Sequence, residues 1–404
     1  MINLYDHQKK ALDETKDKDK CAFYLDMGLG KTITAIEKLK MNGTKHNVVI
    51  CPKSQINMWV EELSKYTNLT LYKPNQSLTW ASADEGTLII NYDSVWRRKE
   101  IASIETLILD ESQMIKNRTS KRTKFITRLV PTHLILLSGT PCGGKYEDLY
   151  TQLKMLGLNM TQRAFWNHFV NWREINFGTG FPVKVVTGYK NETQLKALIS
   201  SLGGVFMKTE EVIDLPKKRF LEVKLEPSSD FKKFHKNRVL DKFNLVGDST
   251  MSQMLGERRL SGQYHQDKLQ WIKDFDIDEP VVVFYNFRDE YELLKGIFES
   301  NGYVVETING DEVSYSSTNA KKVVLCQYQT ASTGHNLQFA RYMIYFTPPL
   351  SCENWQQSQK RIHRIGQSHN CTYYKLIGSP LEEKIYKTIE RGKDFEQKLF
   401  LENF

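Results

Sequence analysis

The chain has 404 residues, a formal net charge of +8, 40% hydrophobic and 26% charged residues. The composition excludes a disordered or fibrous protein, and the length favours two domains over one core. The positive charge is compatible with a polyanionic partner but does not by itself indicate one. Six scattered cysteines without a CxxC pair argue against zinc and disulfides. The apolar runs are too short to span a bilayer, so we expect no membrane partner.

Short β-branched runs alternate with longer helical stretches in two parts of the chain. This pattern predicts parallel sheets with helical crossovers. Between them, from about 146 to 271, the sequence has the pattern of amphipathic helix, interrupted by the turn-rich segment 176–182. We therefore predict an α/β fold of two parallel-sheet lobes. Their expected ranges are 1–210, with a helical insertion at about 146–200, and 211–404, with a helical bridge at about 226–275.

A phosphate-binding loop is predicted after the first apolar run. There the sequence reads Gly28, Leu29, Gly30, Lys31 and Thr32, followed by helical periodicity. Such a loop directs backbone N–H groups at a triphosphate, while the lysine reaches the β and γ phosphates and the hydroxyl binds Mg²⁺. The full GxxxxGK[ST] pattern requires a further glycine where this chain has leucine. On this motif alone, a glycine-rich loop of purely structural use stays open.

Two adjacent acids, Asp110 and Glu111, end another apolar run. In a parallel sheet, ligands collect at the carboxyl ends of the strands. We expect Asp110 to hold Mg²⁺ through water and Glu111 to orient the attacking water. The alternative is an acidic pair that simply starts a loop.

Two further segments suit a coupling role. Ser138 and Thr140 lie in a short polar turn that can sense the phosphate state. Gln357, Arg361 and Arg364 are spaced to share one face of a helix, from which both arginines can reach the γ phosphate across a cleft. A solvated basic helix face is the alternative for the arginines.

Taken in order, these motifs resemble the Snf-type (Swi/Snf-related) branch of the superfamily-two helicase-like ATPases. The resemblance runs nearly from end to end and is most specific in the last motif. The segments that carry it are LYDHQ at 4–8, DMGLGKT at 26–32, ICPKSQ at 50–55, LDESQMIKN at 109–117, SGTPCGGKYEDLY at 138–150, TASTGHNLQFA at 330–340 and RIHRIGQ at 361–367. Against the family pattern, Ser112 and Gln113 replace Ala and His, and Arg341 stands where aspartate is common.

The resemblance implies two RecA-like lobes of the P-loop NTPase fold that hydrolyse ATP with Mg²⁺ and move on double-stranded DNA. It implies catalytic roles for Lys31, Asp110, Glu111, Gln113, Arg361 and Arg364. The ATP-binding residues that it implies are Tyr5, Gln8, Met27, Gly28, Leu29, Gly30, Lys31, Thr32, Gly334, Arg361 and Arg364. Metal binding falls to Thr32 and Asp110, coupling to Ser138, Thr140 and Gln357, and DNA contact to Lys53 and Asn336. Gln8 is the expected contact of the adenine base.

Three other functions remain as alternatives. One is a helicase that separates DNA strands or acts on single-stranded DNA or RNA; RIHRIGQ argues for duplex DNA against RNA. Another is a non-catalytic DNA-binding scaffold, against which the complete catalytic set argues. A third is a P-loop ATPase acting on protein or small-molecule cargo, which would not need the arginine pair. No accessory module is recognised, which suits a bacterial or phage-like motor in the cytoplasm. The process served and any protein partner are not predicted.

Overall fold

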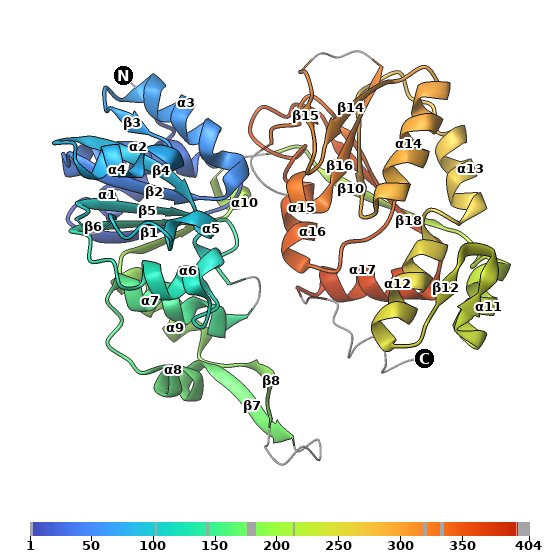
Figure 1. Ribbon diagram of the computed structural model, residues 1–404, viewed down its shortest axis with the longest axis horizontal. Helices are drawn as coiled ribbons and strands as arrows, with labels where there is room; N and C mark the ends of the chain where they lie inside the picture. The colour runs from blue at the N-terminus through green and yellow to red at the C-terminus, as the bar shows by residue number, and fades with distance from the viewer. Residues whose placement is uncertain are drawn as a thin grey trace. The chain divides into compact units, whose positions relative to one another are not determined.

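The computed structural model describes residues 3–101, 103–142, 145–175, 183–212, 215–317, 321–331, 335–392 and 394. The chain divides into two compact units, Met1–Ile213 and Asp214–Phe404 (Figure 1). Each unit is built on one seven-stranded sheet, and in both units the central strands run parallel. The predicted α/β class with two parallel-sheet lobes is confirmed.

All the strand pairs in the sheet of unit 1 are parallel. Its strands are, in sheet order, β3 (Leu71–Tyr72), β4 (Gly86–Asn91), β2 (His46–Cys51), β5 (Thr106–Asp110), β6 (His133–Leu137), β1 (Lys20–Leu25) and β9 (Gly204–Met207). The helices of unit 1 are α1 (Asp6–Glu14), α2 (Lys31–Asn42), α3 (Ile56–Tyr66), α4 (Ser77–Ala81), α5 (Tyr92–Val95), α6 (Lys121–Ile126), α7 (Tyr150–Leu156), α8 (Gln162–Phe169), α9 (Glu192–Ser201) and α10 (Thr209–Val212).

Both faces of the central strands in unit 1 are buried. Val48 and Ile50 of β2 pack into one apolar cluster, while Val49, between them in sequence, packs into the other. Side chains alternate between the two faces of a strand, so each face needs its own cover of helices. This double burial explains why the runs read as continuous β-branched segments rather than as alternating polar and apolar residues.

The insertion of unit 1 differs from the predicted helix. β7 (Val170–Ile175) and β8 (Val183–Tyr189) form an antiparallel hairpin on either side of the segment 176–182, and Figure 1 shows it projecting from the neighbouring helices. The prediction of helix was wrong here because β8 is rich in β-branched residues, which favour strand. The turn-rich segment separates two paired strands rather than two helices.

The sheet of unit 2 is parallel except for the pair β14–β15. Its strands are, in sheet order, β10 (Lys218–Lys224), β18 (Cys371–Ile377), β17 (Tyr342–Tyr345), β13 (Val281–Tyr285), β16 (Lys322–Gln327), β14 (Val304–Ile308) and β15 (Val313–Ser314). The helices are α11 (Ser229–Asn237), α12 (Thr250–Ser261), α13 (Gln266–Asp274), α14 (Arg288–Ser300), α15 (Tyr328–Ala331), α16 (Cys352–Gln359) and α17 (Pro380–Glu390), and a two-stranded hairpin is formed by β11 (Val239–Leu240) and β12 (Leu245–Val246). None of the helices in the described ranges is long and apolar enough to cross a membrane.

Candidate nucleotide site

The strand order of unit 1 brings three of the predicted motifs to one edge of the sheet. β6 lies between β5 and β1, and Leu137 at the end of β6 is level with Asp110 on one side and Phe23 on the other. The carboxyl ends of parallel strands share one edge. The loop after β1, the acids at the end of β5 and the Ser138 turn after β6 are therefore neighbours, although the chain separates them widely.

The loop after β1 has the backbone shape of a phosphate cradle. Gly28 and Gly30 have φ values of 91° and 74°, a left-handed conformation that favours glycine. Gly30 caps α2, which begins at Lys31 and has no acidic residue in its first turn. Lys31 Nζ donates to the carbonyl oxygens of Leu25 at 3.1 Å and Asp26 at 3.5 Å. The helix N-terminus and the ammonium group thus present positive charge at the same place, which fits a triphosphate.

The remaining ATP candidates of unit 1 lie around this loop. Met27 and Leu29 are buried, and Thr32 is half-buried in the first turn of α2. Residue Gly139, in the turn after β6, faces them: a Cβ there would lie 3.1 Å from Met27 Cγ and 3.3 Å from Lys31 Nζ. The turn after β6 therefore packs against the phosphate loop. A side chain at Gly139 would reduce the space beside Lys31.

Side chains of the amino-terminal helix α1 form hydrogen bonds with the same loop. The buried Gln8 donates through Nε2 to the carbonyl oxygens of Leu29 at 3.3 Å and Gly30 at 3.4 Å. Its Oε1 accepts from the backbone N–H of Tyr5 at 2.9 Å, and the Tyr5 side chain is exposed. His7 Nε2 lies 3.0 Å from the carbonyl oxygen of Leu29. Gln8, expected at the adenine base, is thus also a structural tie between α1 and the loop.

Asp110 and Glu111 are both buried, at 4% and 7% exposure. Asp110 Oδ2 accepts a hydrogen bond from Trp59 Nε1 at 2.8 Å, and Oδ1 accepts one from the backbone N–H of Glu111 at 3.0 Å. Burial, reinforced by the Glu111 carboxylate, raises the pKa of Asp110 to about 7. Two buried carboxylates of this kind fit a divalent cation, which would offset their repulsion; Thr32 and Asp110 are the residues that would hold Mg²⁺.

A chain of hydrogen bonds joins these acids to the turn after β6. Gln113 Nε2 donates to Glu111 Oε2 at 2.8 Å, and Ser138 Oγ donates to Gln113 Oε1 at 2.8 Å. The backbone N–H of Thr140 in turn donates to Ser138 Oγ at 3.0 Å. Glu111 has a left-handed backbone, with φ 51°, which is uncommon for a residue other than glycine. We call Glu111, Gln113, Ser138 and Thr140 the amide relay.

Several residues that the sequence did not single out support this edge. Trp59, on α3, bonds Asp110; Gln152, on α7, accepts from Ser112 Oγ at 2.7 Å and donates to the Pro141 carbonyl oxygen at 2.7 Å. Asp26 Oδ2 accepts from both the backbone N–H and the hydroxyl of Thr209. Only Asp26, an acid directly after a strand, carried a local signal. The others act through contacts distant in sequence.

The predicted helix face that carries Gln357, Arg361 and Arg364 is corrected by the structure. α16 ends at Gln359, and both arginines lie in the turns that follow. Arg361 Nε reaches back to the carbonyl oxygen of Gln357 at 3.2 Å, and its Nη1 donates to that of His335 at 3.1 Å. Gln357 Nε2 donates to Glu353 Oε1 at 3.0 Å. The chain leaves the helix at the C-cap Lys360, and the turns that follow hold both arginines and Gly366, whose φ is 94°.

Burial shapes the electrostatics around these turns. It lowers the pKa of Arg364, and together with the Arg361 charge it lowers the pKa of His335 to about 4. His335 is therefore neutral at pH 7. Arg361 also accepts, through its carbonyl oxygen, a hydrogen bond from the backbone N–H of Leu337 at 3.1 Å. The segments 335–340 and 361–367 thus support each other, while the ATP candidate Gly334 lies outside the described residues.

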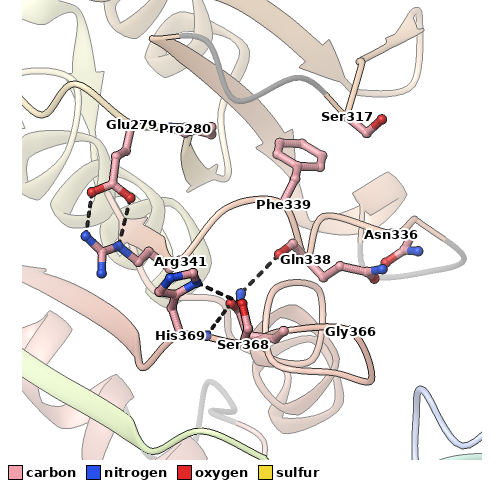
Figure 2. A pocket seen from close by; sticks show the side chains of 11 residues that line it. Glu279, Pro280, Ser317, Asn336, Gln338, Phe339, Arg341, Gly366, Ser368 and His369 are labelled. Atoms are coloured by element: carbon pink, nitrogen blue, oxygen red, sulfur yellow. Dashed lines mark hydrogen bonds and ion pairs between the residues drawn. The ribbon is translucent and has the colours of Figure 1, made fainter.

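The two DNA candidates are exposed, Lys53 in the turn that follows β2 and Asn336 in unit 2. Asn336 lines a hollow of about 490 Å³ in unit 2, shown in Figure 2. In this hollow Arg341, where the family commonly has aspartate, donates from Nε to Glu279 Oε2 at 2.7 Å and from Nη2 to the other carboxylate oxygen. The charge of Arg341 is therefore balanced locally by an ion pair with two hydrogen bonds.

Two family models match this chain. Residues 7–270 match the model of the SNF2-related domain, and residues 267–366 match that of the helicase conserved C-terminal domain. The first match alone covers more than half of the chain, so the protein belongs to the SNF2-related family of helicase-like ATPases.

Similar proteins come from bacteria, archaea and animals. "Uncharacterized ATP-dependent helicase YqhH" of Bacillus subtilis is 21% identical over 95% of this chain and 77% of its own length. "Putative ATP-dependent helicase/translocase YwqA" of the same organism is 24% identical over 90% of this chain but 45% of its own length. The Sulfolobus solfataricus SWI2/SNF2 ATPase core, solved in complex with dsDNA, is 23% identical, covers 99% of this chain and 92% of its own, and has a TM-score of 0.48.

Proposed function

We propose that this protein hydrolyses ATP with Mg²⁺ and couples the reaction to movement along double-stranded DNA. The observation that carries the proposal is the amide relay. The relay connects Glu111, the acid proposed to orient the attacking water, with the turn after β6. A change at the phosphate can therefore alter backbone positions elsewhere in the unit.

The roles proposed for the residues of unit 1 follow from their placement. Bound Mg²⁺ would supply charge neutralisation at the phosphates, with Thr32 and Asp110 holding it. Lys31 and the N-terminus of α2 bind the triphosphate. Glu111, supported by Gln113, orients the attacking water as the general base. Trp59 fixes the orientation of the Asp110 carboxylate.

The roles proposed in unit 2 rest on the family. Arg361 and Arg364 are assigned to the γ phosphate, where they offset the charge that develops during hydrolysis, and Gln357 to coupling. Gly334 is assigned to the nucleotide. Lys53 and Asn336 are assigned to the DNA backbone, since both are exposed and polar or charged.

Double-stranded DNA is the proposed partner, and single-stranded DNA and RNA are the competing ones. The net charge of +8 suits binding to any phosphate backbone, and the membership in the SNF2-related family favours the duplex. The bacterial relatives and the free cysteines support the cytoplasm as the compartment.

Steady-state ATP hydrolysis tests the proposal. The purified protein is assayed without nucleic acid and with single-stranded DNA, duplex DNA or RNA, with Lys31→Ala as the blank. We expect strong stimulation by the duplex. Stimulation mainly by single strands or RNA would instead indicate a helicase, and hydrolysis at the level of the blank in all four conditions would contradict an ATP-driven motor.

A further inference from the structure

A second hollow, in unit 1, lies at the sheet edge opposite to the nucleotide site. It has a volume of about 590 Å³ and is lined by the amino ends of β1 and β6, the segment around α6 and one face of α7. Lys20 begins β1 and is level with Leu134 of β6, whereas the phosphate loop follows the other end of β1. Six residues of strand separate the two ends, a distance of about 16 Å.

The charge of this hollow is entirely positive. Among the described residues that line it there is no aspartate or glutamate, and there are five cations, Lys20, Arg118, Lys124, Arg128 and Lys154. We call it the cationic hollow. Clustered like charges on a concave, partly apolar surface raise the local potential and concentrate anions there.

The cations of the hollow lack carboxylate partners within the part of the chain that the structure describes. Lys154 Nζ donates to the Leu158 carbonyl oxygen at 3.1 Å, and Arg118 bonds the Gln162 side chain and lies over the Tyr150 ring at 5.2 Å. All three partners are neutral, so these contacts do not balance the positive charges of Lys154 and Arg118.

Neighbouring cations outside the hollow behave differently. Arg122, also on α6, lies 3.2 Å from an oxygen of Asp93, and Lys116 lies 3.6 Å from one of Asp148. His133 Nδ1 lies 3.3 Å from Asp19 Oδ1, an ion pair only when the imidazole is protonated. Asp93 and Asp148 thus pair with cations that do not line the cationic hollow.

The floor of the hollow is apolar and decides between anionic occupants. The apolar lining residues Pro131 and Leu134 are buried and Leu129 and Met155 are half-buried, whereas Val130, also in the lining, is 89% exposed and belongs to the rim. A duplex presents its phosphates and sugars outwards on a convex surface, whereas a single strand also offers unpaired bases to an apolar surface. A concave site with a cationic rim and an apolar floor therefore suits a single strand better than a duplex.

We infer that the cationic hollow binds a single nucleic-acid strand, with phosphates at the rim and bases toward the floor. The inference extends the proposed function, from which it takes nucleic acid as the partner. The hollow lies away from the proposed contact Lys53, which follows the carboxyl end of β2. It is thus a second nucleic-acid site, separate from Lys53, the residue of unit 1 that is assigned to the duplex.

Equilibrium binding without nucleotide tests this site separately from the motor. The double variant Lys124→Gln/Arg128→Gln removes two rim charges. The matched control Lys65→Gln/Lys73→Gln removes two exposed lysines of the same unit that line no part of the hollow. Fluorescence anisotropy measures the affinity of each protein for a labelled single-stranded oligonucleotide and for its duplex, over a series of salt concentrations, after thermal melting has shown that the variants fold.

For the double variant, the slope of the logarithm of the single-strand binding constant against the logarithm of salt concentration should fall in magnitude by about 1.4, because two phosphate contacts are lost. Single-strand binding near 0.1 M salt should then weaken roughly 25-fold. The control, and the duplex arm, should change little. Unchanged single-strand binding would overturn the inference and favour an acidic polypeptide as occupant; a duplex loss equal to or greater than the single-strand loss would overturn it as well.

ATP hydrolysis at saturating duplex distinguishes the two proposals. We expect the variant to retain the wild-type maximal rate, because the hollow is separate from the nucleotide site. If the double variant loses single-strand binding but the wild-type protein shows no DNA-stimulated hydrolysis, the single-strand site is supported and the motor is not. If the wild-type protein is stimulated normally but the double variant binds the single strand unchanged, the motor is supported and the single-strand site is not.

Discussion

Gln113 connects two groups on different loops through the two ends of one amide. Its Nε2 donates to Glu111 and its Oε1 accepts from Ser138, 25 residues further along the chain. An amide can satisfy both partners at once because it carries a donor and an acceptor in fixed geometry. Gln113, which stands where the family usually has histidine, therefore contacts both groups at once.

The variant Gln113→Ala removes both contacts of the amide. It should lower the free energy of unfolding by about 1–3 kcal/mol, since a buried carboxylate and a buried hydroxyl lose a partner. Duplex stimulation of hydrolysis should fall more than the basal rate does. Chemical denaturation and the ATPase assay measure the two effects. Gln113→His is the matched control, because imidazole can also donate to one partner and accept from the other; equal losses in both variants would contradict the relay.

Glu111→Gln keeps the size of the side chain but removes its charge. Hydrolysis should fall roughly 10²- to 10⁴-fold, the contribution typical of a general base, while ATP still binds. Nucleotide binding and single-turnover hydrolysis, measured beside Lys31→Ala, separate the steps. We expect Lys31→Ala to weaken ATP binding itself. A Glu111→Gln protein that hydrolyses ATP at the wild-type rate would rule out the assigned role.

At the scale of elements, α2 lies between two glycines that both have a left-handed backbone conformation but differ in their surroundings. Gly30 at its start and Gly43 at its end have φ values of 74° and 66°. A Cβ at Gly30 would collide with Gln8 Nε2, whereas a Cβ at Gly43 would meet nothing within 4 Å. One end of the helix is therefore packed against α1 and the other is open.

This asymmetry gives an internal control. Both Gly30→Ala and Gly43→Ala should cost about 1–2 kcal/mol for the left-handed backbone. Only Gly30→Ala should also displace Gln8 and raise the KM for ATP. Thermal denaturation and ATP titration of the two variants compare these effects. An unchanged KM in Gly30→Ala would argue against a link between α1 and nucleotide binding.

Another tie between elements is the buried ion pair of unit 2. Lys268 on α13 lies 2.7 Å from Glu382 Oε2 on α17, and both side chains are at most 1% exposed. Lys268 Nζ also donates to the Phe346 carbonyl oxygen at 2.9 Å, and the Gly378 backbone N–H donates to Glu382 Oε2 at 2.7 Å. Burial raises the pKa of Glu382 and lowers the pKa of Lys268, so each charge depends on the other.

Lys268→Met should destabilise the protein by about 3–5 kcal/mol because it leaves Glu382 buried and uncompensated. The pKa of Glu382 is raised in the folded state. The loss of stability of the variant relative to wild type should therefore be smallest below about pH 4.3, the pKa of a free glutamate, and should grow as the pH rises. Urea denaturation at several pH values measures this trend. The double variant Lys268→Met/Glu382→Leu should recover most of the loss, and failure to recover would show that the pair is not the cause.

On the scale of the whole molecule, the proposed reaction needs residues from both units. Lys31, Asp110 and Glu111 belong to unit 1, and Arg361 and Arg364 belong to unit 2. Because the proposed general base and the proposed arginines are carried by different units, hydrolysis would depend on how the two units respond to ATP. Such dependence is the physical basis proposed for coupling hydrolysis to movement.

Arg364→Ala should leave ATP binding largely intact while turnover falls about 10³-fold or more. Nucleotide binding measured by titration, beside the steady-state rate, gives the comparison. Arg341→Ala serves as the control because that arginine of the same unit is paired with Glu279. Loss of ATP binding in Arg364→Ala would count against its assignment to the γ phosphate.

The sequence by itself determined the local parts of this protein. The β-branched runs, the glycine loop before a helical stretch and the acids at a strand end are short-range patterns, and they predicted the parallel sheets and the order of the motifs. The prediction of helix over 146–271 overlooked the β-branched residues of β8 and also the edge strands β9 and β10. The spacing of Arg361 and Arg364 did not show that α16 ends before them.

The tertiary structure decided which of these parts meet. The position of β6 between β5 and β1 places Ser138 beside Gln113, and the packing of α3 places Trp59 on Asp110. The cationic hollow likewise gathers residues from four separate segments of the chain. The physical reason is that strand order and helix packing are set by burial summed over the whole unit, whereas a local pattern records only which face of a residue's own element is apolar.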